Sequence, residues 1–142
     1  MTGKIKVLFL CTGNACRSQI AEGWAKHLKA DSIDAYSAGV FPAGLSKRAV
    51  EVMAEAGVDI SQQWSKHVDE IKDIDFDYVV TVCDNARESC PVFPRKTKLI
   101  HKAFEDPTFM DGTEQQIKEA FRRLRDQMKE FITQMPEILE NG

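Results

Sequence analysis

Residues 7–18 read Val7-Leu8-Phe9-Leu10-Cys11-Thr12-Gly13-Asn14-Ala15-Cys16-Arg17-Ser18 and set the architecture of this chain. The first four are apolar, as in a buried strand, and residues 19–28 can form a helix with Ile20, Trp24 and Leu28 along one face. The residues between them therefore form a loop at the start of a helix. Unpaired backbone N–H groups and the positive end of the helix dipole make such a loop a binding site for anions.

The loop also carries a nucleophile and a cationic side chain. The planar guanidinium of Arg17 can bind two oxygens of one anion. The same positive field stabilises a thiolate, so we expect Cys11 to have a lowered pKa and to act as a nucleophile, with Ser18 donating a hydrogen bond to its sulfur. The predicted oxyanion site comprises Cys11 and the residues that follow it: Thr12, Gly13, Asn14, Ala15, Cys16, Arg17 and Ser18.

Composition narrows the class of protein. The 142 residues are 43% hydrophobic, which is enough to bury the core of one domain, so residues 1–142 are expected to form a single domain. The net charge of −3 comes from interspersed acidic and basic residues, which gives no basic surface for nucleic acid or membrane. Small anions and proteins are the expected partners, and we expect a monomer.

Targeting signals and cysteine usage indicate a cytoplasmic protein. The apolar run at residues 5–10 is too short for a signal peptide, and no stretch is long enough to span a bilayer. In the cytoplasm, the four cysteines are expected to be catalytic or redox-active rather than structural disulfides. Their spacings do not match those of a zinc site, so neither a metal nor another cofactor is expected.

Strand-like and helix-like segments alternate along the chain. Further strands are predicted at residues 33–37, 78–82 and 98–101. The helices between them are predicted at residues 46–56, with Ser46 as N-cap and Gly57 after the end, near 67–71, and from 113 to before Pro136. This alternation predicts an α/β fold, an open four-stranded parallel sheet with helices on both faces.

Three reactive side chains follow strands of this sheet. Cys11 follows the first strand, Cys83 follows the strand at residues 78–82, and Asp106 lies in a loop after the strand at 98–101. Chemistry in open parallel sheets gathers at the carboxyl ends of the strands, so we expect these groups to meet at one edge.

Cys-x5-Arg-Ser near the N-terminus, with a late Asp-Pro, resembles the low-molecular-weight protein tyrosine phosphatases over nearly the whole chain. In that family the cysteine attacks the oxyanion centre, the arginine and loop amides bind its oxygens, and the aspartate protonates the leaving oxygen. The resemblance implies these roles for Cys11, Arg17 and Asp106. Glu105, beside Asp106, stays open as an alternative acid.

A second pair of cysteines, Cys83 and Cys90, resembles the thioredoxin-coupled arsenate reductases of the same fold. The runs Tyr36-Ser37-Ala38-Gly39 and Ala21-Glu22-Gly23-Trp24 support that likeness. The resemblance implies that arsenate, with phosphate as a competing oxyanion, is attacked by Cys11. A disulfide would then pass from Cys11–Cys83 to Cys83–Cys90, for reduction by thioredoxin or a similar thiol reductant. We expect the segment from Cys83 to about Pro94 to move during this exchange.

The sequence differs from some of these reductases at the residues that bind potassium. Some reductases of this type bind potassium through side chains matching Asn14, Glu22 and Ser37, with a later aspartate. Lys66 falls near that aspartate here, so we expect its ammonium group to pair with Glu22 and turnover to be independent of potassium. The alternative is that the side chain of Lys66 points into solvent.

Two other functions compete with arsenate reduction. Phosphomonoester hydrolysis needs Cys11, Arg17 and Asp106 but neither Cys83 nor Cys90. A non-enzymatic redox sensor would use the cysteines to change conformation and would turn over neither oxyanion. Both tryptophans, Trp24 and Trp64, are interpreted as packing residues rather than as substrate platforms.

Overall fold

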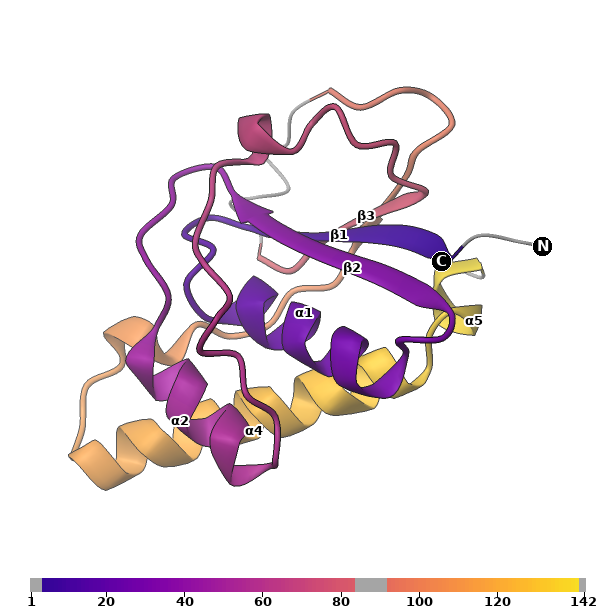
Figure 1. Cartoon of the computed structure of the whole chain (residues 1–142). Coiled ribbons are helices and arrows are strands. Elements are labelled where there is room, and N and C mark those ends of the chain that lie inside the picture. The colour runs from indigo at the N-terminus through magenta and orange to yellow at the C-terminus, as the bar shows by residue number, and fades with distance from the viewer. Residues whose placement is uncertain (1–3, 84–91, 141–142) are drawn as a thin grey trace.

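The computed structural model describes residues 4–83 and 92–140. Its strands β1 (Ile5–Cys11), β2 (Ile33–Gly39), β3 (Tyr78–Thr81) and β4 (Lys98–His101) form one sheet in the order β2-β1-β3-β4 (Figure 1). All neighbouring strands are parallel, which confirms the predicted four-stranded parallel sheet. The register pairs Cys11 with Gly39, so the central strand β1 ends level with its neighbour.

The helices follow the predicted order along the chain. They are α1 (Arg17–Leu28), α2 (Lys47–Glu55), α4 (Glu114–Thr133) and the short α5 (Glu137–Glu140). In Figure 1, α1, α2 and α4 lie on one side of the sheet, and the 3-10 helix η1 (Val68–Glu70) lies on the other side. A second 3-10 helix, η2 (Pro107–Phe109), precedes α4.

Capping residues account for the start and end of α2 and for the start of α4. Ser46 Oγ accepts a hydrogen bond from the N–H of Ala49 at the start of α2, and Gly57 follows that helix with a φ of +83°. Thr113 forms a capping box with Gln116 at the start of α4. The predicted caps at Ser46 and Gly57 are therefore confirmed.

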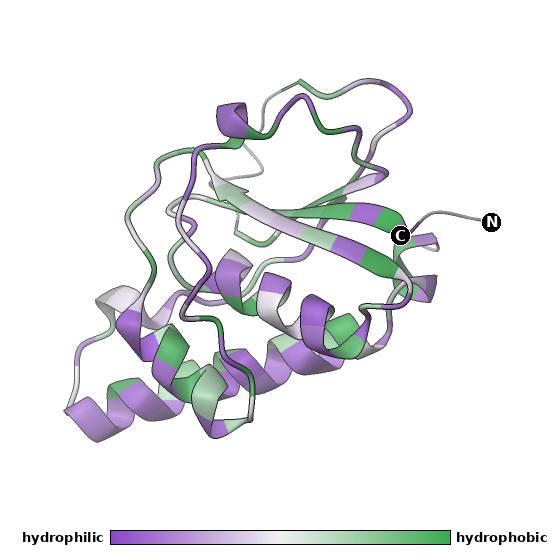
Figure 2. Ribbon diagram, in the orientation of Figure 1, coloured by the Kyte–Doolittle hydropathy of each residue, from purple (hydrophilic) through white to green (hydrophobic). Residues whose placement is uncertain are grey.

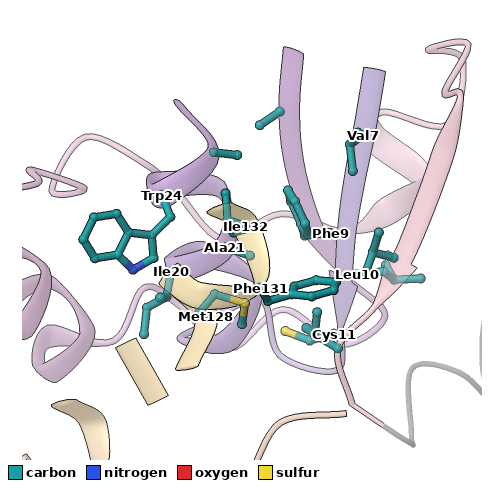
Figure 3. Packing of buried hydrophobic residues seen from close by; sticks show 14 of the residues in the cluster. Val7, Phe9, Leu10, Cys11, Ile20, Ala21, Trp24, Met128, Phe131 and Ile132 are labelled. Carbon is teal, nitrogen blue, oxygen red and sulfur yellow. The ribbon is translucent and has the colours of Figure 1, made fainter. Parts of the chain in front are cut away.

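The core lies between β1, α1 and α4. Figure 3 shows Phe9 of β1, Ile20 and Trp24 of α1, and Met128 and Ile132 of α4 packed around one apolar interior. Hydrophilic residues dominate α4 in Figure 2, which fits a surface helix with one buried stripe. Cys11 belongs to the same buried cluster, so the predicted nucleophile lies at the edge of the core.

Gly23 lets α1 lie close to the segment that follows α2. A Cβ atom at Gly23 would lie 2.5 Å from Ile60 Cγ2 and 3.2 Å from Met53 Cε. Only glycine fits this distance without displacing a buried side chain.

No helix within the described ranges is both long enough and apolar enough to cross a membrane.

Candidate active site at the carboxyl ends of the strands

The loop that follows β1 forms one wall of a cavity of about 330 Å³. Cys16 is the N-cap residue of α1, so the loop lies at the start of that helix, as predicted. The residues that line the cavity are Cys11, Thr12, Gly13, Ala15, Cys16, Arg17, Phe41, Ala43, Asp106 and Thr108. Asn14 and Ser18 are fully buried, and both contact Cys11.

Cys11 is only 2% exposed, and its sulfur has polar partners. Ser18 Oγ lies 2.9 Å from Sγ, and the main-chain N–H of Asn14 donates to it at 3.2 Å. Burial nevertheless raises the pKa of Cys11 above its ordinary value, although the contacts with Ser18 and Asn14 and the charge of Arg17 act to lower it. The predicted lowering is therefore wrong for this structure, because the cost of desolvating a thiolate outweighs the effect of the donors.

Arg17 and Asp106 lie together at the mouth of the cavity, as predicted. Arg17 Nη2 donates to Asp106 Oδ2 at 3.2 Å, and Nη1 donates to the carbonyl of Phe104 at 3.3 Å. Asp106 Oδ1 accepts a hydrogen bond from the N–H of Thr108, because Asp106 is the N-cap of η2. Glu105 is exposed and, with Asp106, lines a neighbouring cavity, but only Asp106 also lines the cavity that contains Cys11. Asp106 rather than Glu105 therefore has the position of an acid.

The second predicted thiol, Cys83, lies beside the same loop. It is 3% exposed, and its Sγ is 3.2 Å from Thr12 Oγ1. Cys90 and residues 84–91 of the segment expected to move lie outside the described residues.

Cys16 is a buried thiol at the rim of the cavity. Burial, with the negative charge of Asp106, raises the pKa of Cys16 to about 12. The group is therefore a neutral thiol at physiological pH.

Lys66 and Glu22 do not form the predicted ion pair. Glu22 accepts hydrogen bonds from Lys26 Nζ at 2.5 Å and from Ser37 Oγ. Lys66 Nζ instead donates to the carbonyl of Trp64 at 3.1 Å. Lys66 is also not solvated: it is buried, and this burial lowers its pKa although the charge of Glu22 opposes the shift. Both sequence-based alternatives for Lys66 are thus wrong.

Trp64 also differs from the prediction of a packing residue. Its side chain is 62% exposed, and Lys66 Nζ lies 4.5 Å from the centroid of its ring. Trp24 is buried and donates its indole N–H to the carbonyl of Arg125, so the packing prediction is confirmed there.

Two residues near the loop were not predicted to matter. A Cβ atom at Gly39 would lie 2.6 Å from the carbonyl oxygen of Thr12, so only glycine lets β2 end against the loop. Gln19 is fully buried and donates to both oxygens of Asn14. The signal for Gly39 was its place at the end of a strand. Gln19 directly follows the loop and ends the run Cys11–Gln19 that resembles the arsenate reductases, but no role was predicted for it.

Among residues 4–83 and 92–140, no three or more His, Cys, Asp or Glu side chains cluster closely enough to hold a metal ion.

A buried cysteine in a loop at a helix N-terminus, with an arginine and an aspartate at the mouth, is the arrangement of cysteine-dependent enzymes that act on tetrahedral oxyanions. The family profile described as "Low molecular weight phosphotyrosine protein phosphatase" matches residues 6–141. The chain belongs to this family, which confirms the resemblance found in its sequence.

Several curated relatives are arsenate reductases. The chain is 45% identical to an arsenate reductase of Bacillus subtilis (strain 168) over 142 residues, which cover 100% of this chain and 99% of the relative. It is 44% identical to an arsenate reductase of Bacillus licheniformis over 137 residues, with 96% and 99% covered.

Similar solved structures include both arsenate reductases and a phosphatase. An arsenate reductase in its reduced state matches with a TM-score of 0.74 and 32% identity, over 95% of this chain and 98% of the other. A low molecular weight protein tyrosine phosphatase from T. tengcongensis matches with a TM-score of 0.76 and 28% identity, over 94% and 99%. A thioredoxin-dependent arsenate reductase from Corynebacterium glutamicum matches with a TM-score of 0.64 and 28% identity, over 92% of this chain but 61% of that one.

Proposed function

We propose that this protein is an arsenate reductase that uses Cys11, Cys83 and Cys90 in succession. The observation that carries the proposal is the place of Cys83, whose sulfur contacts Thr12 in the loop that holds Cys11. Hydrolysis of a phosphate ester needs one cysteine, whereas reduction of an oxyanion needs thiols that supply two electrons. The identity of this chain to curated arsenate reductases supports the same assignment.

The first step forms a bond between sulfur and arsenic. Cys11 gives its proton to an oxygen of the arsenate dianion, and the resulting thiolate attacks arsenic while Arg17 and the loop amides bind the remaining oxygens. One As–O bond breaks, and Asp106 gives its proton to the departing oxygen, which leaves as water when it already carries one proton. Arg17 must turn part of its guanidinium from Asp106 toward the oxyanion, since the two groups compete for the same donors.

The second step transfers two electrons to arsenic. The thiolate of Cys83 attacks Sγ of Cys11, so that an S–S bond forms and the S–As bond breaks with its electron pair on arsenic. Arsenic is thereby reduced from the pentavalent to the trivalent state and leaves as arsenite. Cys90 then attacks Cys83, which releases Cys11 and leaves a Cys83–Cys90 disulfide.

The cycle needs an external dithiol. We propose thioredoxin or a similar protein, since the related Corynebacterium enzyme is described as thioredoxin-dependent. Phosphate is the expected competitor because it has nearly the shape and charge of arsenate, and a related arsenate reductase was solved in a phosphate-binding state. A reducing compartment such as the cytoplasm would keep the thiols available, and we expect the protein to act there as a monomer.

The test is arsenate-dependent oxidation of NADPH in the presence of thioredoxin and thioredoxin reductase. We expect turnover in the wild type and none in Cys83→Ser or Cys90→Ser. Hydrolysis of an aryl phosphate by the same variants is the internal control, because that reaction needs neither thiol. Arsenate turnover that persists without Cys83 would contradict the proposal.

Phosphomonoester hydrolysis is the second candidate, and one observation favours it. The cavity extends beyond the loop to Phe41 and Ala43, which offers apolar surface to an organic group on the oxyanion. A wild type that hydrolyses an aryl phosphate but never consumes NADPH with arsenate would establish this function instead.

A further inference from the structure

Gln19 is a fully buried side chain of α1 that the mechanism above does not use. Its amide nitrogen donates to the carbonyl of Trp64 at 2.9 Å, and to the main-chain and side-chain oxygens of Asn14, both at 3.1 Å. Its amide oxygen accepts a hydrogen bond of 2.7 Å from Gln63. Because a buried amide is costly without partners, these contacts hold Gln19 in one orientation.

The side-chain amide of Asn14 is also fixed in one orientation. The main-chain N–H of Lys66 donates to one of its terminal atoms at 3.0 Å. A main-chain N–H can only donate, so that atom is the oxygen and the amide nitrogen faces the other way. This nitrogen donates to Ser18 Oγ at 2.7 Å.

The hydrogen-bond network of Gln19 and Asn14 ends at the sulfur of Cys11. Ser18 Oγ accepts from Asn14 and can therefore turn its own O–H toward Cys11 Sγ, 2.9 Å away. The main-chain N–H of Asn14 donates to the same sulfur at 3.2 Å. That contact depends on the left-handed backbone of Asn14, whose φ of 48° is unfavourable for most residues and is held by the bound side chain.

We propose that Gln19 is a positioning residue for the Cys11 nucleophile and acts on it through Asn14. By binding both oxygens of Asn14, it keeps the Asn14 N–H and the Ser18 hydroxyl directed at the sulfur. The inference rests on the proposed function only in taking Cys11 as the nucleophile. Both donors oppose the rise in the pKa of Cys11 that burial causes, so their loss would leave less thiolate at neutral pH.

The test is the rate at which iodoacetamide alkylates Cys11, measured against pH in buffer without oxyanions and assigned by peptide fragmentation. In Gln19→Met, which keeps the length of the side chain but not its amide, the midpoint should move upward by about one pH unit. The rate at pH 8 should fall about tenfold. Gln63→Met removes only the partner of Gln19 and should give a smaller shift in the same direction.

Two comparisons separate positioning from general loss of stability. Gly23→Ala strains α1 away from the sulfur and should leave the midpoint unchanged. In a Ser18→Ala background, Gln19→Met should shift the midpoint less than in the wild type, because both changes weaken the same hydrogen bonds.

An unchanged midpoint in Gln19→Met, or an effect that adds fully to that of Ser18→Ala, would overturn the inference. So would a Gly23→Ala shift of equal size. If Gln19→Met does not fold, an unchanged midpoint in Gln63→Met would overturn it. Alkylation needs no arsenate, so a wild type that fails to reduce arsenate would refute the proposed function without affecting this readout.

Discussion

Arg17 binds Asp106 in the structure and is also the residue proposed to bind the oxyanion. Its guanidinium donates to Asp106 and to the carbonyl of Phe104, while its proposed role is to bind an oxyanion beside Cys11. Asp106 therefore competes with the substrate for Arg17.

Asp106→Asn should separate binding from proton donation. We expect kcat for arsenate to fall roughly 10²- to 10⁴-fold, the usual contribution of a general acid. Inhibition by sulfate, a dianion with no proton to share, should become tighter because Arg17 loses its internal partner. Steady-state kinetics with sulfate as inhibitor measures both effects. Glu105→Gln is the matched control and should change neither, whereas weaker inhibition by sulfate in Asp106→Asn would contradict the competition.

Thr12 connects the loop to Cys83. Thr12→Val keeps the shape of the side chain but removes the hydroxyl that contacts the Cys83 sulfur at 3.2 Å. Without this contact we expect formation of the Cys11–Cys83 disulfide to slow up to roughly tenfold, the usual effect of losing one hydrogen bond. Single-turnover mixing with arsenate, followed by thiol counting, gives the rate. Thr12→Ser should stay close to the wild type, and equal rates in Thr12→Val and the wild type would show that the hydroxyl is not used.

At the scale of elements, Gly23 determines how closely α1 approaches α2 and the segment that follows it. Gly23→Ala would place a methyl group against Ile60 and Met53. We expect overpacking to lower the free energy of unfolding by about 1–3 kcal/mol. Urea denaturation measures this difference. Gln115→Ala, at an exposed position of α4, is the control and should change stability by less than about 0.5 kcal/mol.

The segment around Lys66 bears on the role of potassium. Lys66 places a buried ammonium group near Glu22, although the two do not pair directly. Since a positive charge is already present there, we expect arsenate turnover to be the same in potassium and in a larger, inert monovalent cation. Initial rates at constant ionic strength test this expectation, and a clear stimulation by potassium would contradict it.

For the molecule as a whole, the predicted site joins β1, α1 and the loop before η2, so oxyanion binding should stabilise the entire fold. Phosphate at a hundred times its Kd would add about 2.7 kcal/mol. For a chain of this length that corresponds to a rise in Tm of roughly 5–10 °C. Arg17→Met should lose most of the rise in a thermal melt with and without phosphate. An equal rise in the variant would mean that phosphate binds elsewhere.

Sequence reasoning succeeded where the signal is local. The strands, helix caps such as Ser46, and the loop between Cys11 and Arg17 are all encoded by neighbouring residues, and the structure confirms them. The strand ends are less exact: β2 runs to Gly39, two residues beyond its predicted end, and β3 stops at Thr81, one residue short. The pKa of Cys11 was mispredicted because it depends on how completely the fold covers the thiol. Gln19 was missed for a similar reason, since its role arises only when residues 63–66 pack against α1.

The predicted pair between Lys66 and Glu22 was wrong for another reason, because the sequence contains a nearer partner for Glu22. Glu22 and Lys26 are four residues apart in α1, the spacing at which opposite charges meet on a helix. In the structure Lys26 and the hydroxyl of Ser37 bind the two carboxylate oxygens of Glu22, and Lys66 binds the carbonyl of Trp64 instead. The i,i+4 spacing of Glu22 and Lys26 is therefore a better guide to the partner of Glu22 than the resemblance to potassium-binding reductases.

The two tryptophans give this chain a pair of intrinsic optical reporters. Trp24 is 2% exposed in the core, whereas Trp64 is 62% exposed, and its carbonyl accepts the hydrogen bond of Gln19 behind the loop. A collisional quencher such as iodide should therefore mainly reduce the fluorescence of Trp64. The blue-shifted emission of Trp24 should change only when the core unfolds. With Trp24→Phe as the companion variant, fluorescence could separate events at the loop from global unfolding without any attached label.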